Sequence, residues 1–284
     1  WVGSLEAMSD DLSAQIEALT ARMDAMESNS GPTAFVPAQD GDAFWLLFGM
    51  VLVFFMQAGF ALVEAGLTRS KNVANIMAKN IADMCIGVLA FYAVGYAFAY
   101  GSGGGWFIGG GSWFLSGSSL FELPAATLGE DGIWASGGLS GATDFFFQGV
   151  FAATAVTIAS GAMAGRTKFS AYLMFAGLMT AFIYPVVVHW TWGGGLIAEY
   201  INWGDAGSYS DFAGSGIVHL TGGVAAFMGA KALGPRIGKY DEAGKPRAIP
   251  GHNIVFTVIG VFILWLGWFG FNPGSELAAD GYVM

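Results

Sequence analysis

The sequence predicts an all-α integral membrane protein with six transmembrane helices. Its 284 residues are 55% hydrophobic and only 11% charged, with a mean hydropathy of +0.57. Soluble globular domains carry about twice that share of charged residues. Six apolar segments are each long enough to cross a bilayer as a helix. Basic residues are confined to alternate connections between these segments, which is typical of multi-pass membrane proteins.

The first 31 residues are polar and predict a short amphipathic or coiled-coil helix that precedes the membrane domain. A breaker cluster at Ser28–Pro32 ends this helix and begins a linker. We therefore expect a helix at 1–31, a linker at 32–42 and a membrane domain at 43–284. Because the chain begins with Trp1 and ends soon after the sixth apolar segment, we expect a fragment that is incomplete at both ends. The apolar residues of the helix, spaced by three and four, are Leu5, Met8, Leu12, Ile16, Leu19, Met23 and Met26.

The six apolar segments are separated by short polar or Gly-rich connections. The longest connection, 101–143, contains an apolar part, Trp106–Phe121, that is too short and too rich in Gly to span a membrane. We expect this part to be a loop over the membrane surface. The predicted transmembrane helices are Ala43–Leu67, Ile81–Tyr100, Phe145–Met163, Phe169–Val188, Phe212–Leu233 and Ile254–Phe271.

The basic residues predict the orientation of the helices. Apart from Arg22, all of them lie after the first, third and fifth apolar segments or at their ends, whereas the connections after the second and fourth contain none. By the positive-inside rule, odd-numbered helices enter the cytoplasm and the N-terminus is outside. The sequence thus predicts a multi-pass protein of the cytoplasmic membrane. These basic residues are Arg69, Lys71, Lys79, Arg166, Lys168, Lys231, Arg236, Lys239, Lys245 and Arg247.

Ionisable residues within the apolar segments have a structural and a functional interpretation. Glu64 and Asp83 lie near the predicted membrane boundary, where we expect them to accept hydrogen bonds from helix ends or neighbouring helices rather than bind an ion. Asp211 and His219 stand eight residues apart, about 12 Å along a helix. An ionisable residue at that depth by default faces a pathway. A hydrogen bond from His219 to a backbone carbonyl is an equally open alternative.

Aromatic residues gather at the predicted outer ends of the third, fourth and sixth helices. One interpretation is an aromatic belt at the membrane interface. The other is a box of rings around a small cation, each face contributing about 0.5–2 kcal/mol. The aromatic residues concerned, with the adjacent glutamine, are Phe145, Phe146, Phe147, Gln148, Phe151, Trp190, Trp192 and Phe271.

The sequence contains no nucleophile with an adjacent base, no Cys and His set at metal-binding spacing and no glycine loop of the phosphate-binding type. We therefore predict no enzymatic activity, cofactor, metal site or nucleic-acid partner.

Five sequence segments together resemble the Amt/MEP/Rh family of ammonium transporters, in the order and spacing of that family over about residues 43–276. The N-terminal helix lies outside the resemblance. The segments are VEAGLTRSKN at 63–72, FQGVFA at 147–152, WGGGL at 192–196, DFAGSGIVHLTGG at 211–223 and GWFGFNPGS at 267–275.

The resemblance implies an inverted-repeat helical bundle: two repeats of five transmembrane helices plus one more helix, assembled as a homotrimer with a pore in each subunit. This chain would hold the first repeat and the first helix of the second. The resemblance also implies site residues. An external ammonium-recruitment site is matched by Phe147, Phe151, Trp192 and Ser275, and Asp211 matches an aspartate that favours the cation there. Phe151 and Phe271 match a stacked pore gate. His219 matches the first of two pore histidines.

These matches imply that ammonium binds outside, loses its proton and crosses as ammonia through a hydrophobic pore with His219 as a proton relay. An ammonium sensor, with the same fold coupled to a signalling domain, is the main alternative, and a gas channel of the Rh type is a weaker one. Methylammonium is a further candidate substrate. The inward-facing stretch 231–253 is a candidate contact for a cytoplasmic regulatory protein.

Overall fold

The computed structural model describes residues 37–111, 113–116, 141–201 and 209–279. The chain divides into two units, 1–40 and 41–284. The predicted amphipathic helix at 1–31 lies outside the described residues, whereas most of the second unit lies within them.

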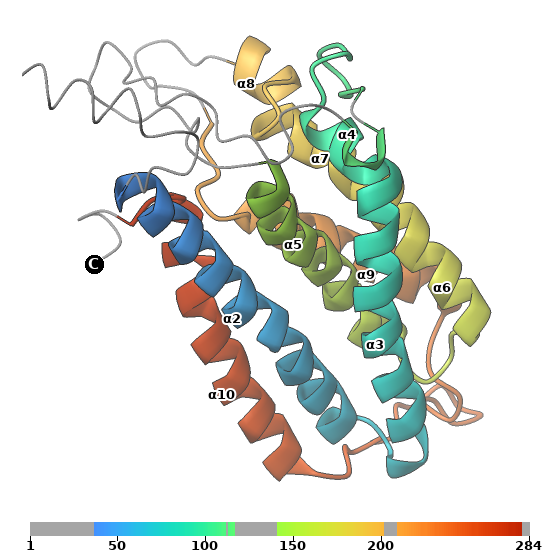
Figure 1. Ribbon diagram of the computed structural model, residues 1–284. Helices are drawn as coiled ribbons and strands as arrows, with labels where there is room; N and C mark the ends of the chain where they lie inside the picture. The colour runs from blue at the N-terminus through green and yellow to red at the C-terminus, as the bar shows by residue number, and fades with distance from the viewer. Residues whose placement is uncertain (1–36, 112, 117–140, 202–208, 280–284) are drawn as a thin grey trace, which may run out of the picture. The chain divides into compact units, whose positions relative to one another are not determined.

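Regular structure in the described residues is helical, apart from two isolated bridges, Ser102 with Gly110 and Tyr240 with Pro246. Six helices in this part of the chain are long and apolar enough to cross a membrane (Figure 1). The prediction of an all-α membrane protein is therefore confirmed. The six spans are Gly41–Leu67, Ser70–Tyr100, Gly141–Met163, Phe169–Ala198, Ser215–Leu233 and Ile254–Glu276.

Three of the spans contain an uninterrupted α-helix, and the other three include a π-helical turn. The uninterrupted helices are α2 (Pro37–Leu67), α5 (Gly141–Met163) and α10 (Ile254–Phe271). The interrupted spans are α3 (Val73–Ala90) joined to α4 (Tyr96–Tyr100) through Phe91–Gly95, α6 (Phe169–Leu178) joined to α7 (Tyr184–Thr191) through Met179–Ile183, and Ser215–Leu220 leading into α9 (Thr221–Leu233). Single π-helical turns within α-helices often mark functional sites.

The predicted helix boundaries differ from the structure mainly at N-terminal ends. The second helix begins at Val73 and not at Ile81, because Lys79 and Asn80 are buried inside it with hydrogen-bond partners. Lys79 is therefore a residue of a membrane helix and not of a loop. Since α2 begins at Pro37, the last six residues of the predicted linker at 32–42 are helical. The described part of the predicted surface loop, 106–111 and 113–116, contains only a short 3₁₀ turn.

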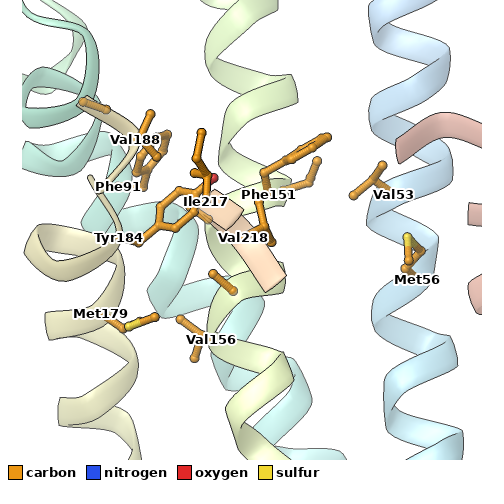
Figure 2. Packing of buried hydrophobic residues seen from close by; sticks show 14 of the residues in the cluster. Val53, Met56, Phe91, Phe151, Val156, Met179, Tyr184, Val188, Ile217 and Val218 are labelled. Carbon is orange, nitrogen blue, oxygen red and sulfur yellow. The ribbon is translucent and has the colours of Figure 1, made fainter. Parts of the chain in front are cut away.

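Helix α5 forms the centre of the described bundle. Its apolar span is the most buried of the six, and it packs extensively against α9 and α3. Figure 2 shows Phe151 of α5 beside Ile217 and Val218 of the fifth span, with Tyr184 of α7 close by. These four side chains are at most 1% exposed. Helix α5 also carries Asp144, Gln148 and Ser160, so the packed core fixes the positions of these polar residues.

Helices α2 and α10 lie side by side (Figure 1) and approach each other through glycine. A Cβ atom added at Gly59 would lie 2.9 Å from Leu264 Cγ and 3.0 Å from the carbonyl oxygen of Gly260. One added at Gly270 would lie 2.5 Å from the carbonyl oxygen of Gly49. Small residues of this kind let two membrane helices pack backbone against backbone.

Candidate outer pocket and histidine site

A cavity of about 390 Å³ lies among residues of α4, α5 and the segments that follow α7 and α10. Three of the predicted site residues, Phe147, Trp192 and Ser275, line it. Its lining residues are Tyr96, Tyr100, Gly141, Asp144, Phe147, Gln148, Trp192, Phe212, Ser275 and Leu277.

A series of aromatic ring contacts leads from this cavity to His219. The ring centroids of Phe147 and Phe151 are 4.7 Å apart, those of Phe151 and Phe271 are 4.2 Å apart, and those of Phe271 and His219 are 5.2 Å apart. The three phenylalanines are at most 2% exposed. Rings of an interfacial belt would face lipid, so the belt interpretation does not apply to these three. Phe146, which is 52% exposed, is compatible with it.

Two hydrogen bonds fix the polar side chains that border the rings. The indole Nε1 of Trp192 donates to the backbone carbonyl of Asp211 at 2.6 Å, and the Trp192 ring lies 6.3 Å from that of Phe151. The hydroxyl of Ser275 donates to the carbonyl of Phe271, also at 2.6 Å. Both side chains are thereby held at the cavity wall.

Asp211 lies at the start of the fifth span and caps it. Its two carboxylate oxygens accept hydrogen bonds of 2.8–2.9 Å from the backbone N–H groups of Gly214, Ser215, Gly216 and Ile217. The residue is 8% exposed and does not line the cavity. Asp211 therefore shapes the pocket through its backbone contact with Trp192, while its charge is directed at the helix end.

Asp144, which the sequence did not mark as a site residue, lines the cavity instead. Its Oδ2 accepts a hydrogen bond of 2.6 Å from the hydroxyl of Tyr96, and its Oδ1 accepts one of 3.3 Å from Nε2 of Gln148. Phe147 and Gln148 follow it by three and four positions, which places all three on one helix face. Its position three residues before the FQGVFA segment could have identified Asp144.

A second polar cluster joins α2, α3, α5 and α6 within the bundle. Ser160 donates to Glu64 at 2.9 Å and accepts from Lys79 at 3.0 Å, while Tyr172 donates to Asp83 at 2.8 Å. The Lys79 ammonium also lies 4.6 Å from the centre of the Tyr172 ring. Glu64 and Asp83 thus accept hydrogen bonds from neighbouring helices, in agreement with the structural role expected for them.

The other two histidines contact backbone carbonyls. The ring nitrogens of the buried His189 lie 2.9 Å from the carbonyl oxygen of Ala99 and 2.8 Å from that of Gly105. The exposed His252 lies 3.0 Å from the carbonyl oxygen of Thr68. His189 is thus held by the backbone of α4 and of the segment that follows it, and His252 is accessible to solvent.

A comparison with known protein families identifies the family of this chain. The model of the Ammonium Transporter Family matches residues 44–284. The chain belongs to the ammonium transporter family. Members of this family are transport proteins and not enzymes, so the prediction of a non-enzymatic membrane protein is confirmed.

Curated relatives of this ammonium transporter family member come from several lineages. Ammonium transporter Amt2 of Archaeoglobus fulgidus is 48% identical over 241 residues, which are 84% of this chain and 48% of the relative. Ammonium transporter Amt1 of Haloferax mediterranei is 43% identical over 245 residues, 85% of this chain and 44% of the relative. The chain therefore spans about half the length of the curated relatives that it matches.

Solved structures show the same fold. A protein described as a sensor Amt protein has a TM-score of 0.74 and 34% identity, over 87% of this chain and 57% of its own. Mep2 of Candida albicans has a TM-score of 0.71 and 25% identity, over 86% of this chain and 50% of its own.

Proposed function

We propose that this protein conducts ammonium or ammonia across the cytoplasmic membrane. The observation that carries the proposal is the continuous series of ring contacts from the cavity lined by Phe147 through Phe151 and Phe271 to His219. The names of the relatives support ammonium as the substrate. In this proposal, Phe147, Phe151, Trp192 and Ser275 recruit the cation at the outer surface.

The mechanism follows from the free energy of desolvation. A small cation loses many kcal/mol of hydration when it enters an apolar, low-dielectric interior. Ring faces can replace part of that hydration at the mouth of the pore, by about 0.5–2 kcal/mol each. Below the mouth, the ring centroids of Phe151 and Phe271 are 4.2 Å apart, and in this proposal the two rings form the gate that a passing molecule displaces.

Loss of a proton removes the electrostatic barrier below the gate. Neutral ammonia can then pass the rings, while the imidazole of His219 accepts the released proton and returns it to ammonia on the inner side, so that one positive charge crosses with each molecule. The His219 ring stacks on Phe271 at an interplanar angle of 18°, directly beyond the gate. Potassium ions carry no proton to lose, so the same path discriminates against them.

The remaining features of the proposal concern the assembly. We infer a homotrimer in the cytoplasmic membrane with the N-terminus outside, methylammonium as a second substrate, and a cytoplasmic regulatory protein at residues 231–253. The alternation of basic residues along the sequence supports the orientation.

Ammonium-evoked current in proteoliposomes tests the transport function. We expect a current from the full-length protein that His219→Ala abolishes or makes less selective against potassium. His252→Ala removes an exposed histidine outside the path and serves as the matched control. A current that is unchanged in both variants would exclude passage along His219.

An ammonium sensor is the second candidate, because the protein described as a sensor Amt protein is among the similar structures. Binding without transport would favour it. The quenching of Trp192 fluorescence by ammonium reports binding independently of current. Ammonium-dependent quenching without any current from the unmodified protein would contradict transport and support the sensor.

A further inference from the structure

Among the described residues that line the proposed cation site, the one carboxylate belongs to Asp144 and not to Asp211. The carboxylate of Asp211 already accepts four backbone hydrogen bonds and is absent from the cavity wall. The carboxylate of Asp144 accepts only two, from Tyr96 and Gln148, and lines the cavity together with Phe147 and Trp192. An oxygen atom of a carboxylate accepts more than one hydrogen bond, so Asp144 retains capacity for a ligand.

Two further acceptors at this cavity have no partner within the protein. The Oε1 atom of Gln148 and the hydroxyl of Tyr100 are buried and make no hydrogen bond in the described structure. Gln148 is 7% exposed, and both residues line the cavity with Asp144. Buried polar atoms without a partner are uncommon in native structures and point to a missing ligand or water.

The charge of Asp144 is not neutralised locally. No Lys or Arg is among the residues that line the cavity. The sequence contains none between Lys79 and Arg166, nor between Lys168 and Lys231, the two stretches that supply eight of the ten lining residues. The interaction of a carboxylate with a nearby cation is stronger where the surrounding medium screens it less, and a bound cation in turn favours the charged form of the carboxylate.

We propose that Asp144 binds the incoming cation directly and that Gln148 and Tyr100 accept hydrogen bonds from it. This inference rests on the proposed function, since it names the anionic wall of the same outer site. The ligand class is a small monovalent cation that donates several hydrogen bonds. Ammonium satisfies both requirements, whereas potassium carries the charge without the donors. Tyr96 positions the carboxylate and does not itself bind the cation.

Asp144→Asn tests the charge. In proteoliposomes of the full-length protein, we expect the half-saturating ammonium concentration of the current to rise about tenfold, which corresponds to about 1.4 kcal/mol, with little change in maximal current. Asp144→Glu should retain most of the affinity. Asp42→Asn is the control, because it removes the same charge near the outer end of α2 and outside the cavity, where Asp42 accepts a hydrogen bond from the backbone N–H of Ala279. This substitution should leave the dependence of the current on ammonium concentration unchanged.

Tyr100→Phe tests the site without altering any hydrogen bond within the protein. It removes a hydroxyl that has no partner, so the fold should be retained. We expect about a threefold rise in the ammonium concentration for half-maximal quenching of Trp192 fluorescence. Tyr184→Phe is the matched control, because its buried hydroxyl also has no partner but Tyr184 does not line the cavity.

Failure of this inference is distinguishable from failure of the transport proposal. Equal ammonium affinity in Asp144→Asn and Asp42→Asn, or in Tyr100→Phe and Tyr184→Phe, would overturn the role of the pocket while a current persists. If the unmodified protein carries no current, the fluorescence titrations of the same variants still decide whether Asp144 and Tyr100 bind ammonium.

Discussion

The carboxylate of Asp211 accepts hydrogen bonds from four backbone N–H groups at the beginning of a membrane helix. The first N–H groups of a helix have no carbonyl partners within the helix. Without an acceptor these groups would be unpaired in an apolar environment. The left-handed conformation of Gly214, with φ of 93°, brings the chain around so that both carboxylate oxygens can reach them. The side chain of Asp211 therefore determines where this helix starts, and its backbone carbonyl holds Trp192.

Asp211→Ala should lower the free energy of unfolding by about 2–3 kcal/mol, because it leaves buried donors without an acceptor. Reversible unfolding of the protein in detergent micelles measures the change. Asp241 is a suitable comparison, since its carboxylate also accepts backbone N–H groups, from Ala243 and Lys245, but in an exposed loop. Asp241→Ala should change the free energy of unfolding by no more than about 0.5 kcal/mol, and equal effects of the two substitutions would contradict the argument.

The sequence identified Asp211 and His219 because polar residues within an apolar segment are unusual. It did not identify Asp144, which stands just before the third apolar segment. The hydrogen bond from Tyr96 and the shared cavity place Asp144 in a site. Tyr96 lies 48 positions earlier in the chain, and no local pattern predicts such a contact.

At the scale of the helices, hydropathy predicted every membrane span but shortened the second. Lys79 and Asn80 interrupt its apolar run, so the predicted helix began after them. In the structure, Lys79 donates to Ser160 and lies over the ring of Tyr172, which makes a buried ammonium compatible with a membrane helix. Polar partners on other helices decide such boundaries, and a single-sequence profile contains no information about them.

The contact between α2 and α10 depends on glycine. In Gly59→Ala, the added methyl group would lie 2.9 Å from Leu264 Cγ and 3.0 Å from a backbone oxygen of Gly260, so the helices would have to separate. We expect a loss of about 1–3 kcal/mol in the free energy of unfolding. Gly223→Ala in α9 is the control, since an added Cβ there meets no atom within 4 Å and should be tolerated. Similar unfolding curves for both variants would show that the two helices do not pack as described.

At the scale of the whole molecule, the distribution of basic residues predicts which loops face the cytoplasm. The exposed connection around Ala243 is basic, while the connection containing Ser102 carries no Lys or Arg. This difference, repeated along the chain, is the basis for the inferred orientation. It is independent of the ring contacts that support the transport proposal.

Cysteine labelling in intact cells checks this orientation. Ser102→Cys should react with a membrane-impermeant maleimide added outside, and Ala243→Cys should react only after the membrane is opened. The native Cys85, which is free and exposed in the described structure, should first be replaced by alanine. Labelling of Ala243→Cys from outside would reverse the proposed topology.

The π-helical turn at Phe91–Gly95 rotates the part of the second span beyond it, about the helix axis, relative to the part before it. An extra residue in a helical turn rotates everything beyond it by about 100°. The stripe that carries Lys79 and Asp83 toward α5 and α6 is therefore not continued by the outer turns that carry Tyr96 and Tyr100. One span thus contributes to two polar clusters, and a helical wheel drawn through its whole length would assign the residues of α4 to the wrong face.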